Sequence, residues 1–390
     1  MKQKSYTADY AALIGFYWMT CCVTNAFASL YLLGVGFSNT AIGLLLAIAS
    51  GISAVLQPLV SRYGDNPRSP ALPRMMLALG LGIAVLAALL YPAQKMPLAV
   101  TAVLYTGCLV LMSTLMPLTN AIGMETLNQG KRLNFGLGRS FGSVGYAVTS
   151  TLMGILAAKL GKGIVPAAAI LLILGFSVAC FRYRLGKGEA SQANARQGSI
   201  GDFLHRYRRF CLMLLGCVLI YISHVVLNNY TLQIAVAKGG SSVEMGVMTA
   251  ISACVEVPVM VLFGRITKRW HSDRLIRVSA VFFVLKALST QLAGSVIGLY
   301  AAQLFQSLGY GLFALVIVYY VNQLMRPEDT VTGQGFASMS NAVGGVLGSV
   351  IGGRLLDVSV DSMLLFSTIA AALGAVVVFA TVERQQPEAD

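Results

Sequence analysis

The sequence predicts an all-α membrane protein whose twelve transmembrane helices form two six-helix halves. Hydrophobic residues make up 56% of the 390 residues and charged residues only 11%, whereas soluble domains carry about 25% charged residues. The apolar residues also gather in long runs, and a helix needs about 20 of them to cross a bilayer. One polar stretch separates the first six runs from the last six, which is the usual build of a secondary transporter.

The spans are predicted in chain order from the apolar runs between polar segments. In the first half they cover residues 10–34, 39–61, 72–93, 97–121, 134–158 and 163–181. In the second half they cover residues 210–236, 244–264, 275–295, 297–324, 330–355 and 361–382. We therefore expect two bundles, residues 1–183 and 209–390, joined by a cytoplasmic linker over residues 184–208.

The two halves repeat a glycine spacing in their fifth spans. Gly145 and Gly154 lie nine residues apart, as do Gly344 and Gly353. Such an echo fits duplicated halves, and small residues let helix backbones approach closely. We expect the second, fifth, eighth and eleventh spans to pack together and to slide during alternating access.

The formal charge of +13 reflects membrane orientation better than nucleic-acid binding. When the spans are threaded from a cytoplasmic N-terminus, most of the 28 Lys and Arg fall on the cytoplasmic side, as the positive-inside rule requires. The residues that instead face outward are Lys95, Lys159, Lys162, Lys238 and Arg354. Both termini are therefore predicted to be cytoplasmic, in the plasma membrane of a bacterium.

Several other function classes lack their sequence signals. The first apolar run is too long for a signal-peptide core and is interpreted as the first span. The seven cysteines show no CxxC spacing, so we expect packing residues, no metal site and no cofactor. No phosphate-binding loop and no nucleophile–base spacing occur, so we expect no enzyme, and uphill transport would draw on an ion gradient.

Two charged residues lie deep inside predicted spans, where a charge is costly unless it is paired or lines a polar cavity. Glu256 and Lys286 each lie nine residues from a cytoplasmic-side arginine, Arg265 and Arg277 respectively. Both are therefore about 13 Å deep, and a salt bridge between them is expected. The pair is predicted to couple transport to protons, although a purely structural ion pair is the alternative.

Arg139, Ser143 and Tyr146 share one face at the start of the fifth span, by their i, i+4, i+7 spacing. The arginine supplies forked hydrogen-bond donors, and the tyrosine supplies an aromatic plane with a polar tip. This strip suits contact with a sugar. The alternative is an arginine that anchors the cytoplasmic end of the helix.

Further polar side chains along other spans suggest a cavity for an uncharged, hydroxyl-rich solute. His224 could carry a proton or bond a neighbouring helix, and Glu125 is a secondary candidate for proton coupling. Singly, neutral polar residues are more often contacts between helices; together they are predicted to bind substrate. These candidates are Asn228, Gln303, Gln306, Asn341, Tyr17 and Asn25.

These residues carry a resemblance to a known family. FGLGRSFGSVGY at residues 135–146 resembles the helix-5 motif of the oligosaccharide–proton symporters, the lactose-permease-like branch of the major facilitator superfamily. VLQPLVSRYGD at 55–65, LVIVYYV at 315–321 and TGQGFASMSNAVGGVLGSVIGGRLLD at 332–357 are further similar stretches. The resemblance implies the major facilitator fold and proton-coupled uptake through a central cavity.

The resemblance also assigns roles to individual residues. The sugar-binding arginine of that branch falls on Arg139, its stacking aromatic on Tyr146 and its helix-9 basic residue on Lys286. Other charged positions of the branch are not reproduced: its helix-8 acid aligns with Ala253 and its helix-10 histidine with Gln306. The proton route is therefore rebuilt around other residues, namely Glu256, Lys286 and His224.

The leading hypothesis is a proton-driven symporter that imports a neutral sugar, glycoside or nucleoside-like solute. Its partners would be that solute, protons and membrane lipid, with no nucleic acid, and it would function as a monomer. The alternatives are proton-coupled efflux of an apolar drug or metabolite, and a non-transporting sensor built on a transporter fold.

Overall fold

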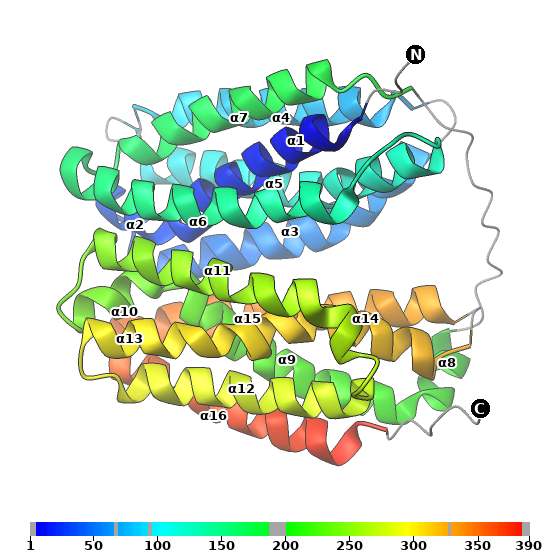
Figure 1. Ribbon diagram of the computed structural model, residues 1–390. Coiled ribbons are helices and arrows are strands. Elements are labelled where there is room, and N and C mark those ends of the chain that lie inside the picture. Colours follow the sequence, from blue (N-terminus) through cyan, green and yellow to red (C-terminus); the bar gives the residue numbers. More distant parts are fainter. Residues whose placement is uncertain (1–4, 66–68, 93–95, 187–199, 327–328, 384–390) are drawn as a thin grey trace. The chain divides into compact units, whose positions relative to one another are not determined.

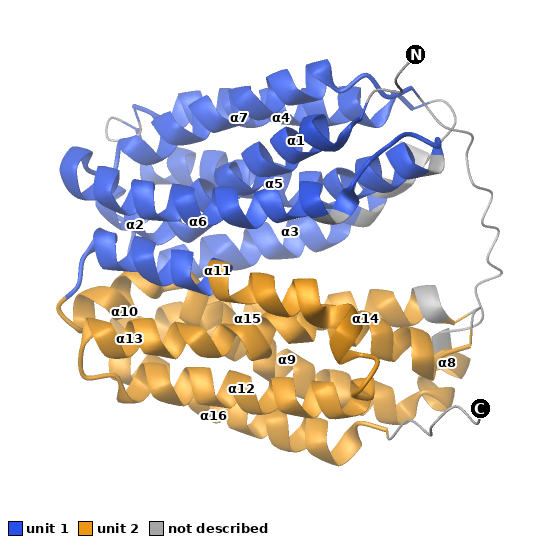
Figure 2. Ribbon diagram, in the orientation of Figure 1, with its two compact units in different colours: residues 1–192, 240–253 blue, residues 193–239, 254–390 orange. Residues whose placement is uncertain are grey.

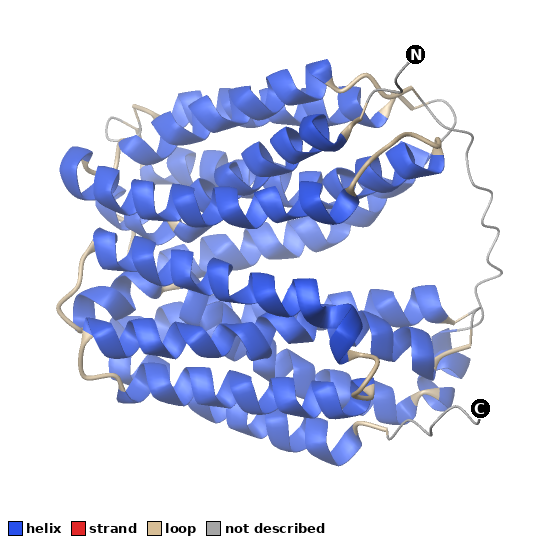
Figure 3. Cartoon of the chain, viewed as in Figure 1, coloured by secondary structure: helices blue, strands red, loops and turns tan. Residues whose placement is uncertain are grey.

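The chain folds entirely from helices in the part that the structure describes. The computed structural model describes residues 5–65, 69–92, 96–186, 200–326 and 329–383. Within these ranges the regular elements are helices (Figure 3), and an isolated β-bridge pairs Ser5 with Arg132. The central part of the expected linker, residues 187–199, lies outside them.

The helices group into two compact units (Figure 2). Unit 1 comprises Met1–Gln192 and Gly240–Ala253, and unit 2 comprises Ala193–Gly239 and Cys254–Asp390. One helix, α11 (Ser242–Ile266), therefore begins in unit 1 and ends in unit 2.

Unit 1 contains the helices of the first predicted half, labelled in Figure 1. They are α1 (Thr7–Cys21), η1 (Cys22–Ala26), α2 (Ala28–Val35), α3 (Asn39–Asp65), α4 (Leu72–Leu90), α5 (Leu98–Asn128), α6 (Phe135–Leu160) and α7 (Ile164–Arg182).

Unit 2 contains the second predicted half and one short helix that precedes it. Besides the second part of α11, its helices are α8 (Ile200–Arg206), α9 (Arg208–Asn229), α10 (Thr231–Ala237), α12 (Ser272–Leu292), α13 (Val296–Gln303), η3 (Leu304–Gln306), η4 (Ser307–Gly311), α14 (Leu312–Leu324), α15 (Thr330–Val358) and α16 (Val360–Thr381).

The described helices agree closely with the twelve predicted spans. Ten are long and apolar enough to cross a membrane, and α1, η1 and α2 together form one further, bent span. The eleventh predicted span corresponds to α15, which has 29 residues but is not among these apolar helices. Its polar residues include Gln334, Ser338 and Asn341, and at about 1.5 Å per residue its length suffices to cross a bilayer.

Helix packing in unit 1 depends on glycines that admit large neighbours. On α6, a Cβ at Gly138 would lie 2.5 Å from Cδ1 of Tyr10, and one at Gly142 would lie 2.5 Å from Cδ1 of Trp18. Real Cβ atoms do not approach other atoms this closely. The glycines on α6 therefore allow the aromatic side chains of α1 to pack against its backbone.

The first part of α11 packs on α6 through a reciprocal pair of hydrogen bonds. The hydroxyl of Ser150 donates to the carbonyl of Gly246 over 2.8 Å, and the hydroxyl of Ser242 donates to the carbonyl of Gly154 over 3.1 Å. Both glycines sit against backbone of the opposite helix. The predicted close packing of the fifth and eighth spans is thus observed within unit 1.

In unit 2, α9 packs closely against both α15 and α16. A Cβ at Gly216 would lie 2.8 Å from the carbonyl oxygen of Gly374 on α16, and one at Gly344 on α15 would lie 2.5 Å from Cβ of Tyr221. The hydroxyls of Ser223 and Ser367 add a 2.8 Å hydrogen bond between α9 and α16. These contacts fix α9 in the centre of the unit.

The first and seventh spans are broken helices, which the hydropathy pattern does not predict. The first span bends by 43° after η1, at the buried Phe27, and α9 ends at the buried Tyr230 before α10 begins. Side chains satisfy backbone carbonyls near both breaks: Tyr105 donates to the Thr24 carbonyl over 2.7 Å, and the hydroxyl of Thr231 donates to the Leu227 carbonyl over 2.9 Å. Such partners make an irregular helix tolerable in an apolar setting.

Candidate transport site

The two deep charges predicted from the sequence are connected in unit 2 through a glutamine. The Lys286 ammonium donates to Oε1 of Gln306 over 2.6 Å. The side-chain amide of Gln306 donates in turn to Oε1 of Glu256 over 2.7 Å. The expected contact between Glu256 and Lys286 is thus bridged by Gln306.

The amide of Gln306 is oriented to suit both charges. Its carbonyl faces the ammonium and its N–H group faces the carboxylate, so both hydrogen bonds are assisted by charge. Lys286 is 3% exposed and Gln306 is 4% exposed, whereas Glu256 is only half-buried. A charge inside a membrane protein is tolerated when hydrogen bonds satisfy it, and both charges of this array are hydrogen-bonded to Gln306.

Irregular helix geometry brings Gln306 to this position. Gln306 ends the short 3₁₀ segment η3, and the π-helix η4 follows it directly. The hydroxyl of Ser279 on α12 donates to the Gly309 carbonyl over 2.7 Å. At Gly311, a Cβ would lie only 3.1 Å from Cγ of Glu256, so the glycine allows η4 to approach α11. π-Helical turns within α-helices are frequent at functional sites.

A stacked imidazole adjoins the array through the same segment. The ring of His224 on α9 lies parallel to that of Tyr310 on η4, with centroids 4.3 Å apart and planes 8° apart. Phe283 meets the imidazole edge-on at 5.7 Å. The side-chain nitrogen of Asn228 lies 3.0 Å from Nε2 of His224. Two more sequence candidates, His224 and Asn228, are therefore brought together here.

In unit 1, an aromatic cluster surrounds the predicted sugar-binding arginine. The guanidinium carbon of Arg139 lies 4.8 Å from the ring centroid of Trp18, within the range of a cation–π interaction. Tyr146 meets Trp18 edge-on, with centroids 6.2 Å apart. Ser143 lies on the same helix between the two and is half-buried. Arg139 and Tyr146 thus contact one indole.

Trp18 was not among the candidates predicted from the sequence. It is one of only two tryptophans in the chain, and it lies well inside the first predicted span. Tryptophans in membrane proteins concentrate at the interfaces. A tryptophan inside a span was therefore the available signal, but its contact with Arg139 depends on how α1 and α6 are rotated.

The remaining candidates form separate local contacts. Tyr17 is buried, and its hydroxyl donates to the Met112 carbonyl over 3.3 Å. Asn25 of η1 donates to the carbonyl of Cys21, the last residue of α1, over 3.2 Å, and Gln303 donates to the Leu299 carbonyl within α13 over 3.4 Å. Glu125 accepts from Gln129 over 2.8 Å at the end of α5, and Asn341 is exposed on α15.

The comparison with known families identifies a transporter. A model described as the MFS_1 like family matches residues 9–367. Multidrug resistance protein 1 of Bacillus subtilis (strain 168) is 26% identical over 137 residues, which make up 35% of each protein. The aligned part therefore spans about a third of this curated relative.

Solved transporter structures share the fold over nearly the whole chain. A point mutant of the nucleoside transporter NupG matches with a TM-score of 0.77 and 14% identity, over 96% of this chain and 98% of that one. An auto-inhibited peptide transporter of the POT family matches with a TM-score of 0.71 and 10% identity, over 96% of both chains. At these identities the likeness concerns the fold. These neighbours are transporters and not enzymes, as the sequence predicted.

Proposed function

The chain belongs to the MFS_1 like family of membrane transporters, and we propose that it is a proton-coupled symporter that works by alternating access. Its substrate is a neutral sugar, glycoside or nucleoside-like solute. It resides in a bacterial plasma membrane with both termini in the cytoplasm, an orientation supported by the distribution of Lys and Arg. The array of Lys286, Gln306 and Glu256 is the observation that carries this proposal.

The array gives a proton a defined effect. An ionised Glu256 accepts a charge-assisted hydrogen bond from Gln306, and Gln306 in turn accepts one from Lys286. Protonation of Glu256 removes the charge from the acceptor, so the hydrogen bond from Gln306 to Glu256 weakens. The hydrogen bond from the Lys286 ammonium to Gln306 weakens with it, because linked hydrogen bonds polarise one another. Proton binding thus loosens the contact between α11, η3 and α12. His224 is a second group through which the proton can pass.

The unit 1 cluster supports the proposed substrate class. Arg139 presents forked donors to hydroxyl groups, while Trp18 and Tyr146 present aromatic surface to the apolar face of a ring. These groups favour a solute with many hydroxyls and no net charge. The shared fold with a nucleoside transporter is consistent with this class.

Proton-coupled efflux of an apolar drug or metabolite is the second candidate. The similarity of about a third of the chain to Multidrug resistance protein 1 favours it. In this case the aromatic cluster around Trp18 would bind the flat, apolar part of the drug. A non-transporting sensor is a lesser candidate, because a sensor does not need the buried array.

The test is transport by the purified protein in liposomes that contain a pH-sensitive dye. Each compound of a panel of neutral sugars, glycosides, nucleosides and amphipathic drugs is added outside, and proton entry is followed. Symport predicts substrate-dependent acidification of the lumen with at least one neutral hydroxylated solute. Proton movement only with drugs, together with drug extrusion upon an imposed proton gradient, would replace symport by efflux. Silence with every compound would contradict both transport functions.

A further inference from the structure

The short helix α8 and Tyr207, the residue that follows it, pack on the rest of unit 2 through aromatic side chains. Phe203 and Tyr207 are buried, and the ring of Phe203 stacks on that of Phe336 of α15, with centroids 5.2 Å apart and planes 7° apart. The chain leaves α8 at Tyr207 and enters α9 at Arg208. The segment that joins the two halves of the sequence is thus attached to the start of α15.

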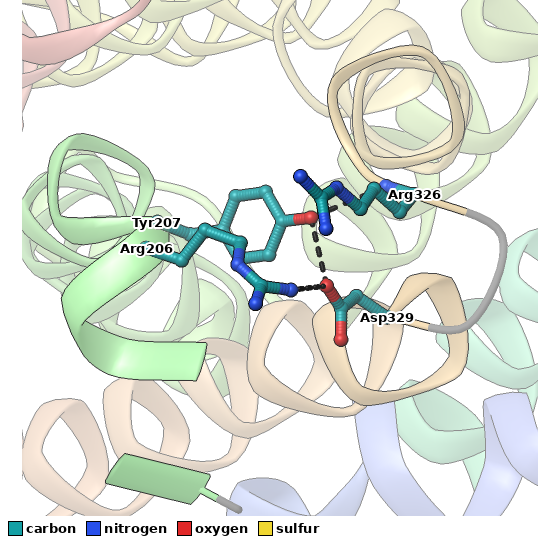
Figure 4. A network of polar contacts seen from close by, with 4 residues as sticks. All are labelled: Arg206, Tyr207, Arg326 and Asp329. Carbon is teal, nitrogen blue, oxygen red and sulfur yellow. Dashed lines mark hydrogen bonds and ion pairs between the residues drawn. The ribbon is translucent and has the colours of Figure 1, made fainter. Parts of the chain in front are cut away.

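Besides these aromatic contacts, one carboxylate oxygen of Asp329 binds the side chains of Arg206 and Tyr207 (Figure 4). Oδ2 of Asp329 lies 3.0 Å from Nη1 of Arg206 and accepts a 2.9 Å hydrogen bond from the Tyr207 hydroxyl. The same hydroxyl accepts a 3.2 Å hydrogen bond from the backbone N–H of Arg326. The Asp329 side chain is 13% exposed, whereas that of Arg206 is 45% exposed. The interaction therefore has a shielded acceptor and an accessible donor.

Asp329 also occupies the N-cap position of α15. Its carbonyl accepts the first bond of that helix, from the N–H of Gly333 over 2.9 Å. Aspartate is among the best N-cap residues because its side chain accepts from a free N–H of the first turn. Here the side chain makes no such bond, and the residue has φ −97° and ψ −12° rather than the extended backbone typical of a cap. The carboxylate holds α8 instead of capping α15.

We propose that Asp329 is a two-position latch between α8 and α15. In the closed position, which the structure presents, its carboxylate holds Arg206 and Tyr207. In the open position the carboxylate turns back to cap α15, and α8 detaches. The carboxylate of Asp329 has hydrogen-bond donors in both positions, so neither position leaves it buried without hydrogen bonds.

Opening the latch lengthens the tether between the two halves of the sequence. Residues 200–207 leave the surface of unit 2, and eight extended residues add up to about 26 Å of reach. The start of α15 changes at the same moment, because its first turn gains a cap. The latch thus couples the free length of the linker to the conformation of the first turn of α15, a helix that is expected to move in transport. It acts on the rate of that motion and is independent of which solute is carried.

Hydrogen exchange of the full-length protein in nanodiscs, compared with that of the variant Tyr207→Phe, tests the latch. Loss of the hydroxyl should speed amide exchange in residues 200–207 at least tenfold, since hydrogen bonds to charged groups are the strong ones. The freed carboxylate should at the same time slow exchange at the N–H of Thr332, the third residue of α15. Arg206→Gln, a change at an accessible side chain, should shift both regions in the same directions.

Two further variants complete the test. Asp329→Ala removes both positions of the latch, so exchange should speed in α8 and stay as in wild type at Thr332, whose N–H the closed position does not cap. Tyr6→Phe, which removes a buried tyrosine hydroxyl that donates to the Arg184 carbonyl in unit 1, should change neither region. Faster exchange in α8 without slower exchange at Thr332 in Tyr207→Phe and Arg206→Gln would reduce Asp329 to a plain structural clamp. Unchanged exchange in α8 would overturn the latch altogether.

Discussion

Replacing Gln306 with methionine should disconnect the buried charges while nearly preserving side-chain volume. The substitution removes the 2.6 Å bond from Lys286 and the 2.7 Å bond to Glu256. Hydrogen bonds to charged groups contribute about 1.5–3 kcal/mol each, so about 3–6 kcal/mol of stabilisation of the ionised array is lost. At about 1.4 kcal/mol per factor of ten, proton-driven uptake should fall at least a hundredfold.

The assay is uptake of the transported solute into liposomes across an imposed proton gradient, with Gln334→Met as the matched control. Gln334 also lies in unit 2 and donates two hydrogen bonds, to the Val318 carbonyl over 2.9 Å and to Asn322 over 3.2 Å. Its acceptors are neutral, so uptake by the control should stay within about threefold of wild type. Uptake by Gln306→Met within that same range, with an unchanged pH profile, would refute the role of the bridge.

Further substitutions test the packing around Trp18, around His224 and between α6 and α11. Gly142→Ala places a Cβ 2.5 Å from Trp18; it should destabilise the protein by about 1–3 kcal/mol and raise the KM for the solute, and a melting curve with uptake kinetics checks both. Tyr310→Ala removes the ring stacked on His224 and should cost about 3–5 kcal/mol, whereas Tyr310→Phe should melt within a few degrees of wild type. Gly246→Ala directs a methyl group at a carbonyl oxygen of α6 2.5 Å away; it should lower the melting temperature, and an unchanged value would contradict the close contact.

Composition and hydropathy were sufficient to predict the spans, because the bilayer dictates the length and polarity of every helix that crosses it. The breaks at Phe27 and Tyr230 could not be predicted in the same way. A hydropathy window averages over about 19 residues, and it carries no information about partners from distant helices, such as Tyr105 of α5, which donates to the Thr24 carbonyl.

The candidate site was predicted in part. Depth along the span correctly selected Glu256 and Lys286 as members of one array, since depth depends only on the sequence distance from the membrane surface. Gln306, which is predicted to bind substrate, also bridges the two charges, because η3 and η4 alter the helical register there. The direction in which the Gln306 side chain points could not be derived from a regular 3.6-residue period.

The pairing of Arg139 with Trp18 illustrates the same difficulty between helices. A helical period groups Arg139, Ser143 and Tyr146 on one face, because all three belong to α6. It carries no information about which residue of α1 faces them. Gly142 is the local reason that an indole fits there, but one glycine among 40 does not identify its neighbour.

The most direct test of proton coupling compares Glu256→Gln with Glu244→Gln in liposomes that hold the transported solute. Both carboxylates lie on α11, but that of Glu244 accepts hydrogen bonds from the N–H and hydroxyl of Ser241 at the start of the helix. Glu256→Gln should exchange solute down its gradient at near wild-type rates and fail to accumulate it against a gradient, while Glu244→Gln should do both. Full proton-driven accumulation by Glu256→Gln would contradict the assignment of Glu256 as the coupling acid.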